Sequence, residues 1–165
     1  MARRHIHYEA AYEDYLRSQG RPYVAVDETR KAIFAGSRVK SFDFVVYPGS
    51  GSNWLVDVKG RKFPYDTPGN RRLWENWVSS EDLEALSEWE QVFGDGFEAM
   101  FVFAYWITSW SAELPGDGLH LFRGEYYAFV GVSLRDYKAH AVRRSLKWGT
   151  VTVPTRKFKA LARAV

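Results

Sequence analysis

The sequence predicts a mixed α/β domain with the element order helix, three strands, helix, strand, followed by C-terminal additions. Three observations support this prediction: a helical apolar stripe near the N-terminus, strand-like runs around a Gly/Ser loop, and a capped helix before a long apolar run. Of the 165 residues, 46% are apolar and 17% aromatic, a composition that favours a folded core over disorder. We therefore expect residues 1–165 to form a single domain.

The first expected helix covers residues 7–19, and Gly20 and Pro22 end it. Its apolar side chains recur at helical spacing, namely Tyr8, Ala11, Tyr12, Tyr15 and Leu16. Residues 22–26, 40–47 and 53–59 are expected to form the three strands because apolar residues dominate them. The stretch 60–77 contains Pro and Gly and is expected to be a long loop.

The second expected helix begins at a cap formed by Ser79 or Ser80 and ends at Gly94. Its apolar positions are Leu83, Leu86, Trp89 and Phe93. Residues 99–108 are expected to form a central strand. The C-terminal additions are a hairpin-like pair at 119–122 and 126–132, a short helix at 134–142, a strand at 151–153 and an amphipathic basic helix at 154–164.

The segment KSFDFVVYPGSGSNWLVDVKGRKF, residues 40–63, places acidic side chains inside two apolar strands. If residues 48–52 form the loop, Val45 faces Leu55 and Asp43 faces Asp57. Cβ atoms of opposed residues lie roughly 4.5–5.5 Å apart, and like charges there destabilise a sheet. Because side chains alternate along a strand, Asp57 and Lys59 share one face with Leu55. A positive charge must therefore compensate the two carboxylates.

Two sources of that charge are open. Lys59 could neutralise both aspartates in a solvated patch, or a divalent cation could bind between them. The cation is favoured because Val45 and Leu55 share the same face, and a buried unpaired carboxylate costs on the order of several kcal/mol. Oxygen ligands in this arrangement suit Mg²⁺ or Mn²⁺ rather than Zn²⁺.

A carboxylate on the first helix, an aspartate in the second strand and Asp-x-Lys in the third resemble the PD-(D/E)XK, or restriction-endonuclease-like, nucleases. The strings FDF, with Asp43, and VDVKGR, with Asp57 and Lys59, carry this resemblance. The opening string HYEAAYEDYL also resembles the bacterial proteins named for the motif HYExAFE, with Tyr12 in place of Phe. The resemblance implies a restriction-endonuclease-like core of order αβββαβ. It also implies metal-dependent hydrolysis of phosphodiester bonds in nucleic acid, with DNA as the expected substrate.

The resemblance further implies a role for each residue of the site. One Mg²⁺ or Mn²⁺ ion would be held by Asp43, Asp57, the backbone carbonyl of Val58 and Glu9. Lys59 would orient or help deprotonate the attacking water and stabilise the charge on the phosphorane oxygens. Glu13 lies one helical turn from Glu9 and is the alternative helix ligand. Glu9 is preferred because it lies about three turns before Gly20, the spacing typical of resolvase-like members.

Basic residues are unevenly distributed along the chain, although the net charge is only +3. No Lys or Arg occurs between Arg72 and Arg123, where ten acidic residues occur, whereas nine basic residues and one acid are found from Arg135 onward. Two basic segments favour a polyanion partner, and a solvated basic face is the alternative. The expected phosphate contacts are Lys40, Arg61, Lys62, Arg71, Arg72, Arg156, Lys159 and Arg163. Trp74 and Trp77, in the expected loop, are candidates for stacking on bases.

Two other functions are compatible with the same fold. A non-catalytic nucleic-acid-binding module could keep the same fold, and an enzyme of this fold could act on another phosphate-bearing substrate. A Gly-rich phosphate loop, HExxH and GxSxG are all absent from the sequence. The chain has no cysteine and no signal-peptide pattern, and its longest apolar run, 99–107, is too short for a membrane span. We expect a cytoplasmic protein with no membrane partner, and the sequence leaves the oligomeric state open, with a homodimer possible.

Overall fold

Helix α1, Arg4–Ser18, opens the fold and ends where the sequence predicts. The structure, a computed structural model, describes residues 4–27, 32–34, 37–110, 113–116 and 118–165. Gly20 follows the helix with a φ of 65°, in the left-handed region that glycine adopts without a Cβ clash. The amides of Gly20 and Arg21 donate to the carbonyls of Arg17 and Leu16, the Schellman pattern of helix termination.

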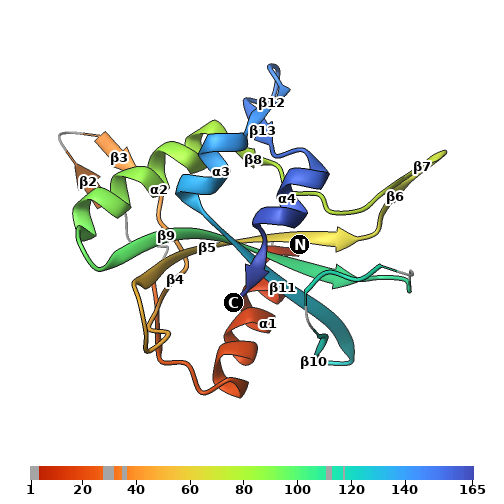
Figure 1. Cartoon of the computed structure of the whole chain (residues 1–165), viewed down its shortest axis with the longest axis horizontal. Coiled ribbons are helices and arrows are strands. Elements are labelled where there is room, and N and C mark those ends of the chain that lie inside the picture. The colour runs from red at the N-terminus through yellow and green to blue at the C-terminus, as the bar shows by residue number, and fades with distance from the viewer. Residues whose placement is uncertain (1–3, 28–31, 35–36, 111–112, 117) are drawn as a thin grey trace.

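A mixed sheet of seven strands forms the centre of the described part of the chain (Figure 1). Its strands are β1 (Tyr23–Ala25), β4 (Phe44–Val46), β5 (Asn53–Phe63), β9 (Phe97–Ile107), β10 (His120–Phe122), β11 (Glu125–Ser133) and β14 (Arg163–Ala164). Six of them lie in the order β1-β4-β5-β9-β11-β10, and β14 pairs with β11. Strands β5 and β9 are parallel along their whole length, and the other pairs are antiparallel.

Short hairpins and three further helices surround the sheet. The additional strands are β2 (Ala32–Phe34), β3 (Ser37–Val39), β6 (Tyr65–Thr67), β7 (Asn70–Arg72), β8 (Val78–Ser79), β12 (Val142–Ser145) and β13 (Thr150–Thr152). The further helices are α2 (Ser80–Phe93), α3 (Leu134–His140) and α4 (Thr155–Leu161). Strands β6 and β7 form a hairpin that projects away from the sheet (Figure 1). Among the described helices, none has the length and apolar character that crossing a membrane requires.

Helix α1 covers one face of the sheet, and α2, α3 and α4 cover the other (Figure 1). Alternation along β9 supplies both apolar layers. Val102 packs on the side of α1 with Tyr12 and Leu16. Phe103 packs on the other side with Tyr137 of α3 and Phe158 of α4. Because both faces are covered, β9 is apolar almost throughout, as is typical of a central strand.

The predicted order αβββαβ is confirmed by α1, β1, β4, β5, α2 and β9. The predicted cap of the second helix is also correct. Ser79 accepts a hydrogen bond from the amide of Asp82, and the Asp82 carboxylate accepts one from the amide of Ser79. This reciprocal capping box satisfies backbone donors that a helix start leaves unpaired.

Two expected elements are wrong. The stretch 60–77 is not a long loop, because β5 continues to Phe63 and the β6–β7 hairpin follows. The continuation of β5 is stabilised by parallel pairing with β9 as far as Phe63 and Ile107. The basic helix at 154–164 is shorter than expected, because α4 ends at Leu161 and Arg163 lies in β14 against β11.

Candidate active site

The β4–β5 hairpin has the register that its loop length predicts. Val45 pairs with Leu55 and Phe44 with Val56, so Asp43, directly before β4, comes opposite Asp57. The amide of Asp43 donates to the carbonyl of Val56 over 2.9 Å. One carboxylate oxygen of the buried Asp43 accepts a 2.6 Å hydrogen bond from the amide of Val58. Asp43 is therefore held by backbone groups of the strand that carries Asp57.

Lys59 lies on the same face of β5 as Asp57, two residues further along the strand. Its Nζ is 3.2 Å from Oδ2 of Asp57 and 3.0 Å from Oδ2 of Asp82. The other oxygen of Asp82 is 2.6 Å from Nζ of Lys40. The site is thus an alternating network of carboxylates and ammonium groups that joins β5 to the first turn of α2.

Asp82 is the member of this network that the sequence analysis missed. Its side chain is buried at the start of α2, where it also completes the capping box with Ser79. The string SSED, residues 79–82, carries the capping-box pattern, so a signal for the local role was present. The contact with Lys59 carries no such signal, because it depends on how α2 packs against β5.

Burial and neighbouring charges shift the pKa values of the network in different directions. Burial raises the pKa of Asp57, and the negative charge of Asp82 adds to this effect. The Lys59 ammonium and a hydrogen bond with Asp43 oppose that rise without cancelling it. Burial would lower the pKa of Lys59, but the carboxylates of Asp57 and Asp82 outweigh burial and raise it. Lys59 is therefore a stably charged ammonium at neutral pH.

Asp82 behaves in the opposite way to Asp57. Burial by itself would raise the pKa of Asp82, but Lys59 and Lys40 favour the charged form strongly enough to hold it below the usual range. The two carboxylates that share Lys59 therefore differ in character, because Asp82 is fully ionised and Asp57 is the carboxylate whose charge is poorly compensated.

The residues proposed from the sequence line one cavity of about 380 Å³. Its lining includes Glu9, Lys40, Asp43, Asp57, Val58, Lys59, Arg61 and Asp82. Glu13, the alternative helix acid, is instead 3.7 Å from Arg17 in an ion pair within α1. The structure therefore places Glu9, rather than Glu13, beside the strand carboxylates.

The donor atoms of this cavity fit a hard divalent cation. Among the residues that the structure describes, no three His, Cys, Asp or Glu side chains form a ready-made metal site. However, Mg²⁺ is commonly bound by one or two protein carboxylates, with water and substrate phosphate completing its octahedral coordination. Asp43 and Asp57 supply such a pair, and a second positive charge would compensate the half-buried Asp57 carboxylate, whose pKa is raised by desolvation.

The basic residues expected to contact phosphates occupy two regions. Lys40 and Arg61 line the carboxylate cavity, and Lys62 is exposed on β5. The second region is the β6–β7 hairpin, where Arg71 pairs with Asp66 at 3.5 Å. Arg72 of the same hairpin lies 3.6 Å from Glu75.

The C-terminal basic residues do not share one helical face. Arg156 is exposed on α4, and Lys159 forms an ion pair with Glu113. Arg163 lies in β14 and contacts Glu98 at 3.0 Å. Arg163 therefore lies outside the helix, although the sequence analysis placed it in the basic helix at 154–164.

Of the two tryptophans expected to stack on bases, Trp74 is a core residue. It is only 8% exposed and packs edge-on against Phe63, Tyr105 and Phe158. Trp77 is partly exposed and lines the carboxylate cavity. The expectation for Trp74 is wrong because the segment that contains it folds back over the sheet.

Comparison with known proteins identifies the fold. No protein-family model and no curated protein sequence matches the chain. Among solved structures, the chain is similar to the Holliday junction resolvase Hjc of the archaeal hyperthermophile Archaeoglobus fulgidus. The TM-score is 0.53 at 15% sequence identity, over 96% of this chain and 94% of the resolvase. The predicted restriction-endonuclease-like fold is confirmed. The narrower resemblance to the HYExAFE proteins gains no support from the family comparison.

Proposed function

We propose that the protein is a metal-dependent nuclease that hydrolyses phosphodiester bonds of nucleic acid, with DNA as its substrate. The observation that supports this proposal best is the single cavity lined by Glu9, Asp43, Asp57 and Lys59. These four residues come from three segments of the chain, with Glu9 in α1, Asp43 directly before β4, and Asp57 and Lys59 in β5. A fold shared with a DNA junction resolvase is consistent with this chemistry but does not by itself establish it.

Asp43, Asp57, the carbonyl of Val58 and Glu9 would hold Mg²⁺ or Mn²⁺ in this proposal. The bound ion would act as a Lewis acid on the phosphate and lower the pKa of a water molecule. The protein itself fixes the orientation of Asp43 through the amide of Val58. Burial of Asp57 strengthens the electrostatic attraction of a cation to this position.

Lys59 would stabilise the negative charge that develops on the phosphorane oxygens. Its raised pKa keeps the ammonium protonated, so charge stabilisation and proton donation suit it better than abstraction of a proton from water. Asp57 and Asp82 hold this ammonium from two sides. The two ion pairs thus favour charge stabilisation by Lys59 over deprotonation of the attacking water.

The alternative function is a non-catalytic nucleic-acid-binding module. One observation favours it: Lys59 bridges Asp57 and Asp82, so these charges are partly neutralised without a metal ion. Both readings predict that replacing Lys59 by Met leaves metal binding intact or strengthens it, because an ammonium cannot ligate a cation. Turnover separates them.

The deciding experiment is single-turnover cleavage of labelled branched, single-stranded and duplex DNA and RNA, with Mg²⁺ and with Mn²⁺. We expect metal-dependent cleavage by the wild type and a loss of about 100-fold or more in the Lys59→Met variant. Lys138→Met is a matched control, because Lys138 lies on α3 and bonds to Ser87 outside the cavity. Equal cleavage by Lys59→Met and wild type would remove Lys59 from the mechanism. No cleavage of any substrate by the wild type would favour the binding module.

We further propose, from the sequence resemblance, that the chain is a single cytoplasmic domain related to the HYExAFE proteins. These assignments rest on the string at 7–13 and on the absence of cysteine. They do not affect the chemistry of the site.

A further inference from the structure

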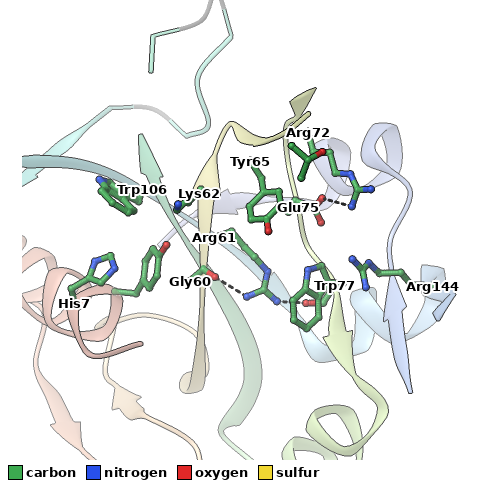
Figure 2. A pocket seen from close by; sticks show the side chains of 12 residues that line it. His7, Gly60, Arg61, Lys62, Tyr65, Arg72, Glu75, Trp77, Trp106 and Arg144 are labelled. Carbon is green, nitrogen blue, oxygen red and sulfur yellow. Dashed lines mark hydrogen bonds and ion pairs between the residues drawn. The ribbon is translucent and has the colours of Figure 1, made fainter. Parts of the chain in front are cut away.

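A second, larger cavity of about 790 Å³ lies beside the carboxylate cavity. Its lining combines aromatic and basic side chains from several elements, chiefly Lys62, Tyr65, Arg72, Trp77, Trp106 and Arg144. We call it the aromatic–basic pocket. Figure 2 shows Trp106 and Lys62 on one side, Trp77 and Arg144 on the other, and Arg61 between them. Its volume is within the range of pockets that bind small molecules and nucleotides.

The two cavities adjoin each other and share part of their lining. Tyr8, Gly60, Arg61 and Trp77 line both of them. Gly60 follows Lys59 directly on β5, so the strand that carries the proposed catalytic lysine continues into the floor of the aromatic–basic pocket. A substrate strand whose phosphate lies at the carboxylates therefore has a neighbouring nucleotide within reach of this pocket.

Positive charge in the aromatic–basic pocket exceeds the negative charge of its lining, which holds Arg61, Lys62, Arg72 and Arg144 against Glu75. Within the described residues, Arg61, Lys62 and Arg144 form no ion pair with a carboxylate within 4.0 Å. Glu75 is the acidic residue of the lining, and Arg72 is paired with it at 3.6 Å. Three cations that lack an ion-paired carboxylate in one concave site favour an anionic ligand.

Arg61 is a fixed member of this set rather than a mobile surface charge. It donates to the carbonyls of Gly60, at 2.7 Å, and of Trp77, and its guanidinium lies 4.1 Å from the Trp77 ring centroid. Burial lowers the pKa of Arg61, which shows that this cation lacks the solvation of an exposed arginine. Arg144 approaches the same Trp77 ring at 5.1 Å.

Aromatic groups of the pocket are available for stacking. Tyr65 is 44% exposed, and Trp106 is partly exposed with Lys62 at 5.6 Å from its ring. A nucleobase offers such rings a stacking face only when it is unpaired or extruded, because neighbouring bases cover both faces inside a duplex. Aromatic rings beside unpaired cations are the combination that binds single-stranded nucleic acid.

We propose that the aromatic–basic pocket binds one unpaired nucleotide of the substrate strand next to the scissile phosphate. The base stacks on Tyr65 and Trp106, and the adjacent phosphates lie against Lys62, Arg61 and Arg144. The preferred substrate is therefore DNA with a single-stranded or branched segment at the cleavage point rather than continuous duplex. This inference rests on the proposed nuclease function for the position of the scissile phosphate, but not for the binding of the nucleotide.

Binding without turnover tests the pocket independently of catalysis. We would measure the affinity of the full chain for single-stranded oligothymidylate and for blunt duplex by fluorescence anisotropy in the absence of divalent metal. Stacking of one base contributes about 1–3 kcal/mol, so Trp106→Ala should weaken oligothymidylate binding by roughly 5- to 150-fold. Trp106→Phe should restore most of the affinity. Duplex affinity should be unchanged in both variants.

Two further variants guard against loss of folding. Tyr65→Ala removes an exposed ring and should reproduce the selective loss at smaller size, even if Trp106→Ala proves unstable. Trp148→Ala is the matched control, because Trp148 is 69% exposed and does not line the pocket. Equal affinity of Tyr65→Ala and wild type for oligothymidylate, or an equal loss for duplex and single strand, would overturn the proposal.

A competition arm separates a strand nucleotide from a free one. If thymidine monophosphate displaces oligothymidylate with the affinity of the oligonucleotide itself, the pocket is a small-molecule site and the proposal fails. If selective single-strand binding is seen but no substrate is cleaved, the pocket assignment stands and the nuclease proposal fails. If cleavage is seen but is equally efficient on blunt duplex and single strand in every variant, the nuclease proposal stands and the pocket assignment fails.

Discussion

Asp82 should contribute more to the stability of this protein than any other acidic residue of the first turn of α2. Its carboxylate caps the helix, contacts Nζ of Lys59 at 3.0 Å and contacts Nζ of Lys40 at 2.6 Å. Replacing Asp82 by Ala removes all three interactions. Replacing it by Asn removes the charge but leaves an oxygen that can still accept the bond from Ser79.

The magnitude follows from these contacts. Loss of a capping interaction costs about 1 kcal/mol. Removing one partner of a buried ion pair costs about 3–5 kcal/mol. We reduce this cost to about 2 kcal/mol, because Lys59 remains paired with Asp57 and because the Lys40 side chain is 51% exposed. The Ala variant should thus lose about 3 kcal/mol and the Asn variant about 2 kcal/mol. For a domain of this size, 1 kcal/mol shifts Tm by roughly 2–4 °C, so we expect falls of about 6–12 °C and 4–8 °C.

The assay is thermal unfolding followed by circular dichroism at neutral pH. Glu81→Gln is the matched control, because Glu81 lies beside Asp82 in the same turn but is exposed, and it should change stability by less than about 0.5 kcal/mol. The reasoning is refuted if Asp82→Asn and Glu81→Gln unfold at the same temperature.

Acidification provides a second readout of the same network. The folded-state pKa of Asp82 lies below its ordinary value of about 3.9, so its contribution is complete above about pH 4 and is lost as the pH falls toward the folded-state value. The unfolded chain takes up the proton first, which favours unfolding in acid. The stability difference between wild type and Asp82→Asn should therefore shrink below about pH 4. If the stability difference between wild type and Asp82→Asn stayed constant from about pH 4 down to about pH 2, the role of Lys59 and Lys40 would be contradicted.

Other predictions concern the metal site and the packing of α1. Asp43→Asn should keep the fold, because an amide oxygen can accept the bond from Val58, but should weaken Mn²⁺ binding at least about tenfold by calorimetry; unchanged affinity would exclude Asp43 as a ligand. Gly60→Ala should lower the free energy of unfolding by about 1–3 kcal/mol in urea, because the added Cβ would lie 2.0 Å from the ring of Tyr8. Gly118→Ala, which meets no atom within 4 Å, is its control, and equal midpoints would refute the packing argument.

The sequence by itself determined where α1 ends, where α2 begins and the register of the β4–β5 hairpin. Gly20 ends α1 and Ser79 caps α2 because these signals act through the backbone of neighbouring residues. The pairing of Val45 with Leu55 follows from the length of the loop between them, since an antiparallel hairpin leaves no other freedom. From that register, the opposition of Asp43 and Asp57 could be counted along the printed sequence.

Only the tertiary structure decided which distant residues complete the site. Asp82 reaches Lys59 because α2 packs across β5, and Trp106 meets Lys62 because β9 pairs with β5 in parallel. The same pairing extends β5 beyond Gly60, where local Gly and Pro signals favour a loop. Such contacts join segments far apart in the chain, and their free energy comes from burying apolar faces and pairing strand edges, neither of which the residues of one segment specify alone.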